Sequence, residues 1–585
     1  MKALLSGNEA IARGAYESGA SFAAAYPGTP STEILENITQ YEQIRAQWAP
    51  NEKVALEVAI GAALGGARSL AAMKHVGLNV AADPFFSASY MGVNGGLVVV
   101  SADDPAMHSS QNEQDNRWYA RAAKVPMFEP ADSQEAKEFV RLAFQVSEEF
   151  DTPVLIRTTT RINHSKSVVT LSERLESPIR KYESNFPKNV LLPSNARQRH
   201  VFVEDRMQRL AESANSAEFN RVEWASKELG IITSGIAYQY AREAFPDASF
   251  LKIGMTHPMP KRLIREFARA VSKIYVIEEL DPFLEEQIRA MGIAVTGKEK
   301  LPLLYELSQD IIAEAFDRQR GKTAALKSNP IPVRPPVLCP GCSHRGVFYA
   351  MKKLRLTVTG DIGCYTLAAL PPLSCMDTCL DMGASVGIAE GLEKANPEQM
   401  KGKLIGVIGD STFIHSGITG LIDVIYNKAH TKLCILDNHI TAMTGHQEHP
   451  GSGMTLSREQ THKLDLEAVC QAIGVKRVVR VDPYSLDDVI RVLKQEMAAA
   501  EPSVIIADAP CIIRARKRFS EPYWVDEEKC IECRMCFRVG CPAVEKAESG
   551  KTRINRLLCI GCDVCRQVCK PGAIQKPVDA SRSTS

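Results

Sequence analysis

The sequence predicts a multidomain α/β protein that ends in a small cysteine-rich domain. Its 585 residues exceed what one hydrophobic core supports, because a typical domain holds about 150 residues. Short apolar segments alternate with amphipathic ones, as in parallel sheets that are covered by helices. Half of the 16 cysteines lie between residues 530 and 569, in a segment too short to be held together by apolar burial alone.

Charge and hydropathy argue against two classes of protein. The 70 basic and 69 acidic side chains leave a net charge of +1, which gives no field to attract nucleic acid or an anionic membrane. Asn8 and Glu9 interrupt the N-terminal apolar run, unlike a secretory signal, and no segment approaches the ~18–20 apolar residues of a membrane span. We expect a soluble, cytoplasmic protein whose cysteines ligate metal rather than form disulfides.

The order of the segments predicts five parts. Residues 1–170 hold four candidate buried strands, SFAAAYPGTP, ARSLAAMKHVG, GGLVVVSADDP and TPVLIRTTT, and form a first α/β domain. Residues 171–225 are polar and form a connecting segment, and residues 226–325 repeat the alternation on a smaller scale. A proline-rich stretch at 331–342 introduces a third α/β domain at 337–515, with KLIGVIGD, TKLCILDN and SVIIADAP as its clearest strands. Residues 522–578 form the cysteine-rich domain.

The cysteine-rich domain carries one motif twice. Each run has three cysteines spaced CxxCxxC and a more distant fourth that precedes a proline by one or two residues. Three closely spaced thiolates surround one corner of an iron–sulfur cubane, and in two-cluster ferredoxins the fourth ligand comes from the other run. This crossing pattern predicts two [4Fe–4S] clusters, one held by Cys530, Cys533, Cys536 and Cys569 and the other by Cys559, Cys562, Cys565 and Cys541.

Two departures from the usual ferredoxin spacing concern loops and not ligands. The first run has four residues before its last cysteine, where three are usual, and the second reads CKP instead of CP. The alternative is a pair of structural zinc sites, which need four ligands each and have no use for a third closely spaced cysteine. We interpret the segment as a bacterial-type dicluster ferredoxin domain that moves single electrons.

A candidate metal site lies in the third α/β domain. Asp410 ends one predicted strand and Asn438 ends the next, and parallel strands place such residues side by side at the carboxyl edge, where ligands bind. Hard oxygen ligands suit Mg²⁺, which typically binds one or two carboxylates and the phosphates of its ligand. Gly-Asp and Asp-Asn are also common in turns, so this pair alone leaves that alternative open.

Gly383, in MGASVGIAEGL, is expected to open a helix whose N-terminus receives a diphosphate, with tight helix packing as the alternative. The pattern resembles the thiamine diphosphate fold, in which Gly409, Asp410, Ser411, Asn438 and Ile440 would hold the cofactor and Mg²⁺. That fold also requires a glutamate that bonds the aminopyrimidine ring of thiamine. We assign this role to Glu57, since it lies in the apolar segment ALEVAIGAALGGA, where an acid without a partner is costly. Glu52 is expected to be a solvated acid at the start of the helix.

A thiamine site and a dicluster ferredoxin on one chain resemble the 2-oxoacid:ferredoxin oxidoreductases, and most closely the large subunits of the indolepyruvate type. The resemblance covers essentially the whole chain, through YPGTPSTEI, MKHVGLN, CPGCSHRG, GDIGCYTL, MGASVGIAEG, GDSTFIHSG, TAMTGHQEHPG and the cysteine tail. It implies two thiamine-diphosphate-type parallel-sheet domains, pyrimidine-binding at 1–170 and diphosphate-binding at 337–515. A transketolase-C-terminal-like domain would lie between them, and an α+β ferredoxin domain would follow.

The resemblance also implies residues that contact the substrate. Thr29 of the YPGTP loop would bind it, and an arginine would meet its carboxylate, with Arg121 as first choice and Arg117 as second; a surface ion pair explains either arginine nearly as well. Where pyruvate-using relatives have an asparagine, this chain has Met443. We therefore expect Met443 and His446 to select bulky aromatic substrates.

Four further cysteines match positions that hold a cluster near thiamine in the pyruvate enzymes, namely Cys339, Cys342, Cys364 and Cys511. A third [4Fe–4S] cluster is the prediction, and a redox pair, a zinc site or buried thiols are the alternatives. The cysteines that fit no ligand spacing are Cys375, Cys379, Cys434 and Cys470. His75 and His108 lie in strand-end loops near the expected substrate site, although a structural role is the better expectation.

The implied reaction is the oxidative decarboxylation of an arylpyruvate, with indolepyruvate as first choice, by coenzyme A and oxidised ferredoxin to arylacetyl-CoA, CO₂ and reduced ferredoxin. A smaller beta subunit would complete a heterodimer, and two heterodimers would form the enzyme. A non-oxidative thiamine decarboxylase would have no use for the cluster cysteines. An electron-transfer subunit would need neither Glu57 nor Asp410. A 2-oxoacid:ferredoxin oxidoreductase with another substrate stays open.

Overall fold

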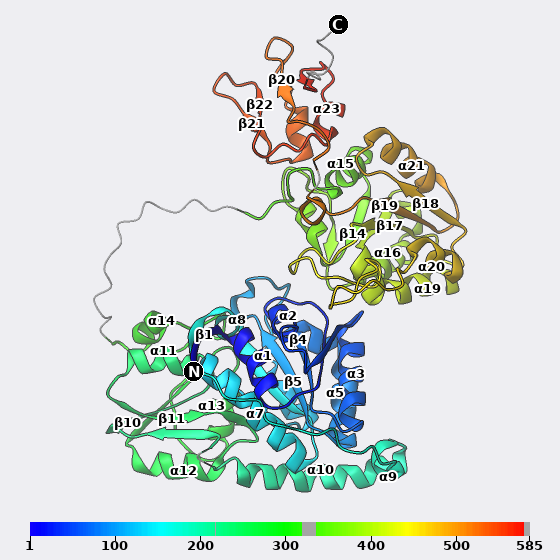
Figure 1. Ribbon diagram of the computed structural model, residues 1–585. Coiled ribbons are helices and arrows are strands. Elements are labelled where there is room, and N and C mark those ends of the chain that lie inside the picture. Colours follow the sequence, from blue (N-terminus) through cyan, green and yellow to red (C-terminus); the bar gives the residue numbers. More distant parts are fainter. Residues whose placement is uncertain (217, 319–334, 517, 578–585) are drawn as a thin grey trace. The chain divides into compact units, whose positions relative to one another are not determined.

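The computed structural model describes residues 1–216, 218–318, 335–516 and 518–577 (Figure 1). The chain divides into two compact units, Met1–Lys327 and Ser328–Ser585. The expected end of the second α/β domain at 319–325, part of the proline-rich stretch and residue 578 lie outside the described residues. The division into five parts is finer than these two units and stays a prediction.

The first unit is built on a seven-stranded sheet in the order β12-β6-β7-β5-β4-β2-β3. Its neighbours are parallel except for the β12–β6 pair. The four strands predicted for residues 1–170 are all present in it. The bounds are β2 Phe22–Ala25, β3 Arg45–Trp48, β4 Ser69–Lys74, β5 Leu97–Asp103, β6 Met127–Phe128, β7 Val154–Thr159 and β12 Met255–His257. A separate antiparallel pair joins β1 (Lys2–Ser6) to β8 (Lys166–Thr170).

Helices cover this sheet because each turns an apolar stripe toward it. In α7, for example, Asp132 caps the first turn by accepting the Glu135 N–H at 2.9 Å, and buried residues recur at helical spacing. The helices are α1 Gly7–Glu17, α2 Thr32–Ile38, α3 Glu52–Leu64, α4 His75–Val80, α5 Ala82–Met91, α6 Arg117–Ala123, α7 Ser133–Phe150 and α8 Thr160–His164, with a 3-10 turn η1 at Pro105–Met107.

A second sheet of the first unit has the order β13-β10-β11-β9. Its edge strand β9 comes from the expected connecting segment, residues 171–225. Strand β12 of the second α/β domain joins the first sheet, so the sheets do not follow the predicted domain boundaries. Side chains of both sheets also share one core. The strands are β9 Asn220–Glu223, β10 Ser226–Thr233, β11 Ala248–Ile253 and β13 Lys273–Ile277. The helices are α9 Phe186–Asn189, α10 Pro193–Ser213, α11 Ala237–Ala244, α12 Lys261–Ala270, α13 Phe283–Arg289 and α14 Gln309–Ala315.

The second unit contains a six-stranded, wholly parallel sheet in the order β15-β14-β16-β17-β19-β18. The three strands predicted here are β16, β17 and β19. The bounds are β14 Thr357–Gly360, β15 Thr378–Cys379, β16 Leu404–Gly409, β17 Lys432–Asp437, β18 Arg477–Val481 and β19 Ser503–Asp508. The helical elements are α15 His344–Leu354, η2 Cys364–Ala369, α16 Ala384–Ala395, α17 Pro397–Met400, α18 Asp410–Thr412, η3 Phe413–Gly417, α19 Ile418–Tyr426, α20 Leu466–Ile473, α21 Leu486–Ala498 and α22 Ile512–Ala515.

The cysteine-rich segment has little regular structure of its own. It consists of two antiparallel strand pairs, β20–β23 and β21–β22, and two short helical turns. Their bounds are β20 Trp524–Val525, η4 Met535–Val539, β21 Val544–Lys546, β22 Thr552–Ile554, α23 Val564–Gln567 and β23 Ile574–Gln575. Its apolar residues, such as Val539 and Ile554, join one core with Phe348 of α15 and Val489 of α21. Among the helices of the described ranges, none is long and apolar enough to cross a membrane.

A buried ionic network ties the two sheets of the first unit together. Arg117 is 1% exposed and donates to Asp115 at 2.9 Å and to Glu278 at 2.6 Å. Its remaining N–H group donates to the backbone carbonyls of Glu279 and Asp281 at 2.9 Å. Removal of one partner from such a buried network leaves the other charges uncompensated in a medium of low polarity.

We expect Arg117→Met to lower the free energy of unfolding of the first unit by about 3–5 kcal/mol, because Asp115 and Glu278 would stay buried without their cation. The matched control is Arg121→Met in the same helix, where the side chain is exposed and stacks on Trp118 at 5.4 Å; its effect should stay within about 0.5 kcal/mol. Urea unfolding followed by fluorescence measures both. Equal shifts of the two midpoints would contradict this account.

Candidate active site and cysteine clusters

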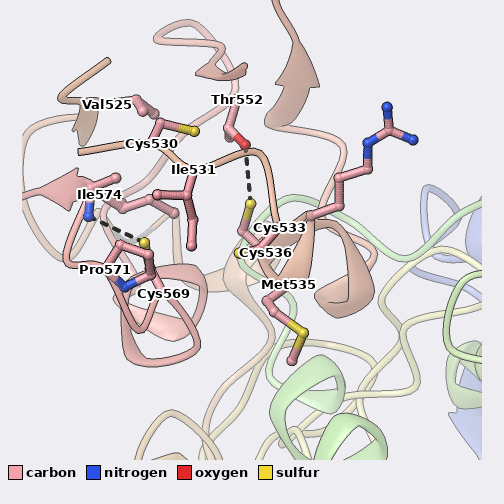
Figure 2. A pocket seen from close by; sticks show the side chains of 12 residues that line it. Val525, Cys530, Ile531, Cys533, Met535, Cys536, Thr552, Cys569, Pro571 and Ile574 are labelled. Atoms are coloured by element: carbon pink, nitrogen blue, oxygen red, sulfur yellow. Dashed lines mark hydrogen bonds between the residues drawn. The ribbon is translucent and has the colours of Figure 1, made fainter. Parts of the chain in front are cut away.

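The first predicted cysteine set lines one cavity in the tail. Figure 2 shows the sulfurs of Cys530, Cys533, Cys536 and Cys569 around it, with Ile531 and Ile574 beside them. Two further contacts reach the sulfurs, since Thr552 Oγ1 lies 3.3 Å from Cys536 Sγ and the Ala573 N–H donates to Cys569 Sγ at 3.2 Å. The fourth cysteine of the second run is therefore next to the first three of the first run, as the crossing pattern predicts.

The second predicted set lines another cavity, whose cysteines are Cys541, Cys559, Cys562 and Cys565. Pro340 and Gly341 of the CPGC loop also line it. Gly341 has φ +69°, and a Cβ there would lie 2.1 Å from Ile560 Cδ1. The CPGC loop thus needs glycine at this point to pack directly against the second set.

The four cysteines of the predicted third set also interact with one another. Burial, together with the nearby thiols of Cys511 and Cys339 and the carboxylate of Asp410, raises the pKa of the Cys364 thiol to about 11. Burial raises the pKa of Cys342 to about 12, with smaller contributions from Cys339 and Cys364. Buried thiols that resist ionisation are poor nucleophiles, which argues against a reactive redox pair. Cysteine thiols are also the ligand type that binds iron in clusters.

Zinc and a cubane differ in the sulfur spacing that they require. Tetrahedral zinc, with Zn–S bonds of about 2.3 Å, brings its sulfurs to about 3.8 Å of one another. Across the described ranges, the only group of three potential ligands with all atoms within 4.8 Å is Asp437, His439 and Asp508. A cubane needs the wider spacing, because each cysteine binds a different iron atom.

The carboxyl edge of the second unit's sheet holds the predicted metal ligands. β16 and β17 are parallel neighbours with Gly409 opposite Leu436, so Asp410 and Asn438 leave the sheet side by side. Both are buried, and Thr441 Oγ1 donates to Ser411 Oγ at 2.8 Å across the two strand ends. The donor set of a carboxylate, an amide oxygen and the Ile440 carbonyl consists of hard oxygens, and its chemistry fits Mg²⁺.

His449 lies against this site and was missed from the sequence. Its Nδ1 accepts the Gly451 N–H at 3.1 Å, so its Nε2 carries the proton and donates to Asp410 Oδ2 at 3.1 Å. Burial opposes ionisation of Asp410, but this hydrogen bond and the Ser411 N–H outweigh it and lower the pKa of the carboxyl group. The sequence did carry a signal for this residue, because His449 is the second histidine of the GHQEHPG motif. Only the first histidine, His446, was considered as a site residue.

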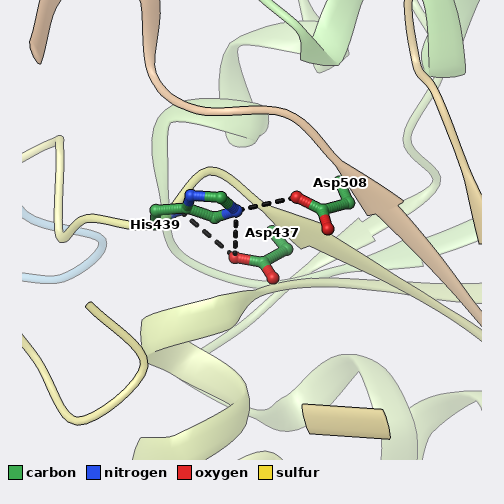
Figure 3. Close-up of side chains that lie close together, drawn as sticks. All are labelled: Asp437, His439 and Asp508. Atoms are coloured by element: carbon green, nitrogen blue, oxygen red, sulfur yellow. Dashed lines mark hydrogen bonds and ion pairs between the residues drawn. The ribbon is translucent and has the colours of Figure 1, made fainter. Parts of the chain in front are cut away.

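Asp437, His439 and Asp508 form a charged group beside the metal ligands (Figure 3). His439 Nε2 lies 2.7 Å from Asp508 and 3.6 Å from Asp437, and Arg480 donates to the other Asp508 oxygen at 2.8 Å. The hydrogen bond to Asp508 raises the pKa of the imidazole. His439 and Arg480 already offset the carboxylates of Asp437 and Asp508. We therefore interpret the group as an internal ion-pair network and not as a metal site.

Gly383 contributes close packing at the start of α16. It has φ +92°, and a Cβ there would lie 2.6 Å from Ser416 Cβ. Its N–H donates to Asp361 Oδ2 at 3.1 Å, and the Ser385 hydroxyl donates to the same oxygen at 2.8 Å. This N–H is therefore bonded to a protein carboxylate. Diphosphate binding at the helix end stays a prediction.

The prediction that Glu57 is the buried acid of the first unit is wrong. Its side chain is 44% exposed and forms an ion pair with Lys53 one turn earlier. Glu52 is the buried acid instead, at 5% exposure. It shares the stripe of α3 that buries Ala55, Leu56, Ala59 and Ala63, whereas Glu57 points away from that stripe.

Two neighbours define the surroundings of Glu52. A Cβ on Gly77 would lie 2.6 Å from Glu52 Oε1, so a larger residue there would displace the carboxylate. Burial lowers the pKa of Lys74 to about 8, and Asp104 and Glu52 counteract that shift. Glu52 thus faces the carboxyl edge of the first sheet, close to the end of β4.

The other predicted contacts in the first unit have mixed outcomes. Thr29 is partly exposed in a loop that Asn8 holds through the Pro30 carbonyl at 2.8 Å. Arg117 is fully paired within its buried ionic network, so the prediction that it binds substrate is wrong. Arg121 is exposed and stacks on Trp118.

The two histidines of the strand-end loops have protein partners. His75 is buried and its Nε2 lies 3.1 Å from Asn112 Oδ1, and His108 lies 3.3 Å from Glu306. In the second unit, Met443 is 50% exposed, and His446 is partly exposed at φ +70°. The role of Met443 and His446 in substrate choice stays a prediction.

Two family models match the regions that contain these sites. The thiamine diphosphate-binding model of pyruvate flavodoxin/ferredoxin oxidoreductases matches residues 13–220, and the C-terminal TPP-binding model of thiamine pyrophosphate enzymes matches residues 361–507. The indolepyruvate oxidoreductase subunit IorA of Archaeoglobus fulgidus is 41% identical over 98% of this chain and 97% of its own length. The chain belongs to the IorA family. The predicted pair of thiamine-type parallel-sheet domains is confirmed.

Other IorA proteins match equally along their length. The subunit from Methanothermobacter thermautotrophicus is 40% identical, and that from Pyrococcus horikoshii is 38% identical, each over 98% of this chain and 97% of its own. A solved 2-oxoglutarate:ferredoxin oxidoreductase from Magnetococcus marinus is 16% identical, with a TM-score of 0.46 over 54% of this chain and 65% of that one.

We expect His449→Leu to weaken Mg²⁺-dependent binding of thiamine diphosphate by roughly tenfold or more, because partners that orient a metal ligand contribute that much to affinity. His446→Leu, three residues earlier, should leave this affinity unchanged. Titration of the apoprotein with thiamine diphosphate at fixed Mg²⁺, followed by fluorescence quenching, compares the two. Unchanged affinity in His449→Leu would contradict the role given to His449.

Proposed function

We propose that this chain is the thiamine- and cluster-bearing subunit of an arylpyruvate:ferredoxin oxidoreductase. One 2-oxoacid, one coenzyme A and two oxidised ferredoxins yield one acyl-CoA, one CO₂, two reduced ferredoxins and a proton. Indolepyruvate is the first expected substrate, as the names of the relatives indicate. The observation that carries the proposal is the gathering of two four-cysteine sets in a chain that also matches two thiamine-binding models.

The residues of the chain bind and orient the cofactor, which supplies the carbon–carbon bond cleavage when bound. Asp410, Asn438 and the Ile440 carbonyl would hold Mg²⁺ against the diphosphate, and His449 fixes the orientation and charge of Asp410. Glu52 takes the role first given to Glu57, since a buried carboxylate can exchange a hydrogen bond and a proton with an aminopyrimidine. Its burial and the glycine space beside it support this role.

Electrons would leave through three clusters in a fixed order. Cys364 interacts with Asp410, which favours the set of Cys339, Cys342, Cys364 and Cys511 as the first acceptor. The CPGC loop lines the cavity of Cys541, Cys559, Cys562 and Cys565, which makes that set second. The set of Cys530, Cys533, Cys536 and Cys569 would be last, because Cys533 is exposed and open to an external acceptor.

The partners follow from this chemistry. Ferredoxin would take the electrons, and a smaller beta subunit would complete the enzyme as a dimer of heterodimers. Met443 and His446 would favour aromatic substrates, since a soft apolar side chain replaces a polar contact. Thiolate ligation of this extent suits the reducing cytoplasm.

Glu52→Gln is expected to lower kcat by about 100-fold or more, because the side chain keeps its shape but loses the proton that the ring needs. Glu57→Gln on the same helix should retain activity within a few-fold. Steady-state rates of both variants, with thiamine diphosphate content measured in parallel, test the assignment. A large loss in Glu57→Gln with full activity in Glu52→Gln would reverse it.

The function itself is tested by viologen reduction with the protein purified anaerobically together with the partner it retains. We expect coenzyme A-dependent reduction with indolepyruvate and little with pyruvate. CO₂ release without viologen reduction, from a complex replete in iron and thiamine, would indicate non-oxidative decarboxylation and contradict the proposal.

A further inference from the structure

Arg345 is a buried cation at the start of α15. It is 3% exposed, and its guanidinium donates only to backbone carbonyls. On one side it bonds the Cys339 carbonyl at 3.0 Å and the Leu338 carbonyl. On the other it bonds the Val539 carbonyl at 3.4 Å and the Gly540 carbonyl, directly before Cys541.

No acidic side chain of the described residues pairs with Arg345. Isolated buried charges are strongly destabilising, so a guanidinium in this position needs a negative group nearby. The side chains that interact with it electrostatically are thiols of two sets, Cys339 and Cys342 of the third set and Cys541 and Cys562 of the second. Burial lowers the pKa of Arg345, and these four thiols oppose that shift.

The surrounding backbone is shaped to admit the guanidinium. Gly540 has φ +71°, and a Cβ there would lie 3.2 Å from Arg345 Nη1. Gly341, also left-handed, brings the CPGC loop against Ile560 on the other side. The two cysteine sets therefore approach each other at the place where Arg345 lies.

We propose that Arg345 is an electrostatic bridge between two clusters and stabilises the reduced state of both. This inference rests on the proposed function, which puts clusters at both cysteine sets. One electron leaves the cluster of Cys339, Cys342, Cys364 and Cys511, which is oxidised, and enters the cluster of Cys541, Cys559, Cys562 and Cys565, which is reduced. A fixed cation between the two clusters stabilises the additional negative charge of whichever cluster is reduced, and no proton is transferred.

The test is Arg345→Gln in the holoenzyme, studied by potentiometric titration with EPR detection of each cluster. We expect the reduction equilibria of both clusters to shift at least tenfold toward the oxidised form, equivalent to ~59 mV lower for each one-electron couple. The cluster of Cys530, Cys533, Cys536 and Cys569 should not shift. The matched control is Arg538→Gln, an exposed arginine of η4 close to Gly540, whose charge is screened by water; it should move none of the three.

Unchanged potentials of both clusters in an iron-replete Arg345→Gln variant would overturn the proposal. If that variant does not assemble, Arg345→Lys carries the test. Lysine keeps the charge but donates three hydrogen bonds instead of five, so it can approach only one of the two sides, and at least one potential should fall. Absence of clusters from the unmodified holoenzyme would instead refute the proposed function, and iron and sulfide analysis separates that outcome.

Discussion

The parallel alignment of strands in the second unit's sheet is the constraint on which the rest of the site depends. Because neighbouring strands run in one direction, the loops that follow β14, β16, β17 and β19 emerge at one edge. These loops carry Cys364, Asp410, Asn438 and Cys511. The Cys511 N–H donates to the Asn438 carbonyl at 2.9 Å, so a predicted metal ligand and a cysteine of the predicted third set share a hydrogen bond. The register of one sheet thus brings the predicted metal ligands and cysteines of the predicted third set together.

The sequence predicted those parts of the site that local motifs encode. The two cysteine sets of the tail follow from spacing, and Asp410 and Asn438 follow from their positions after buried strands. The choice of Glu57 over Glu52 was wrong, because Val54 and Val58 make α3 apolar on both faces and hide which stripe is buried. The sequence also did not separate Arg117 from Arg121. The burial of Arg117 depends on Glu278, which is 161 residues away, and no local pattern reports such a contact.

Arg117 and Arg345 are both buried, and their partners differ in kind. Arg117 has Asp115 and Glu278, so its charge is balanced by the protein itself. Arg345 bonds four backbone carbonyls and interacts electrostatically with four thiols, so the balance of its charge depends on what those thiols bind. The stability of the second unit and its cluster content are therefore coupled, because a cluster with four thiolates supplies the negative charge that the side chains around Arg345 lack.

The central claim is that electrons from the 2-oxoacid pass into clusters on this chain. Rapid-freeze EPR after mixing the anaerobic holoenzyme with indolepyruvate and coenzyme A measures this directly. We expect signals of reduced [4Fe–4S] clusters to appear within one turnover, together with one equivalent of CO₂. Release of CO₂ while the clusters remain oxidised would contradict it.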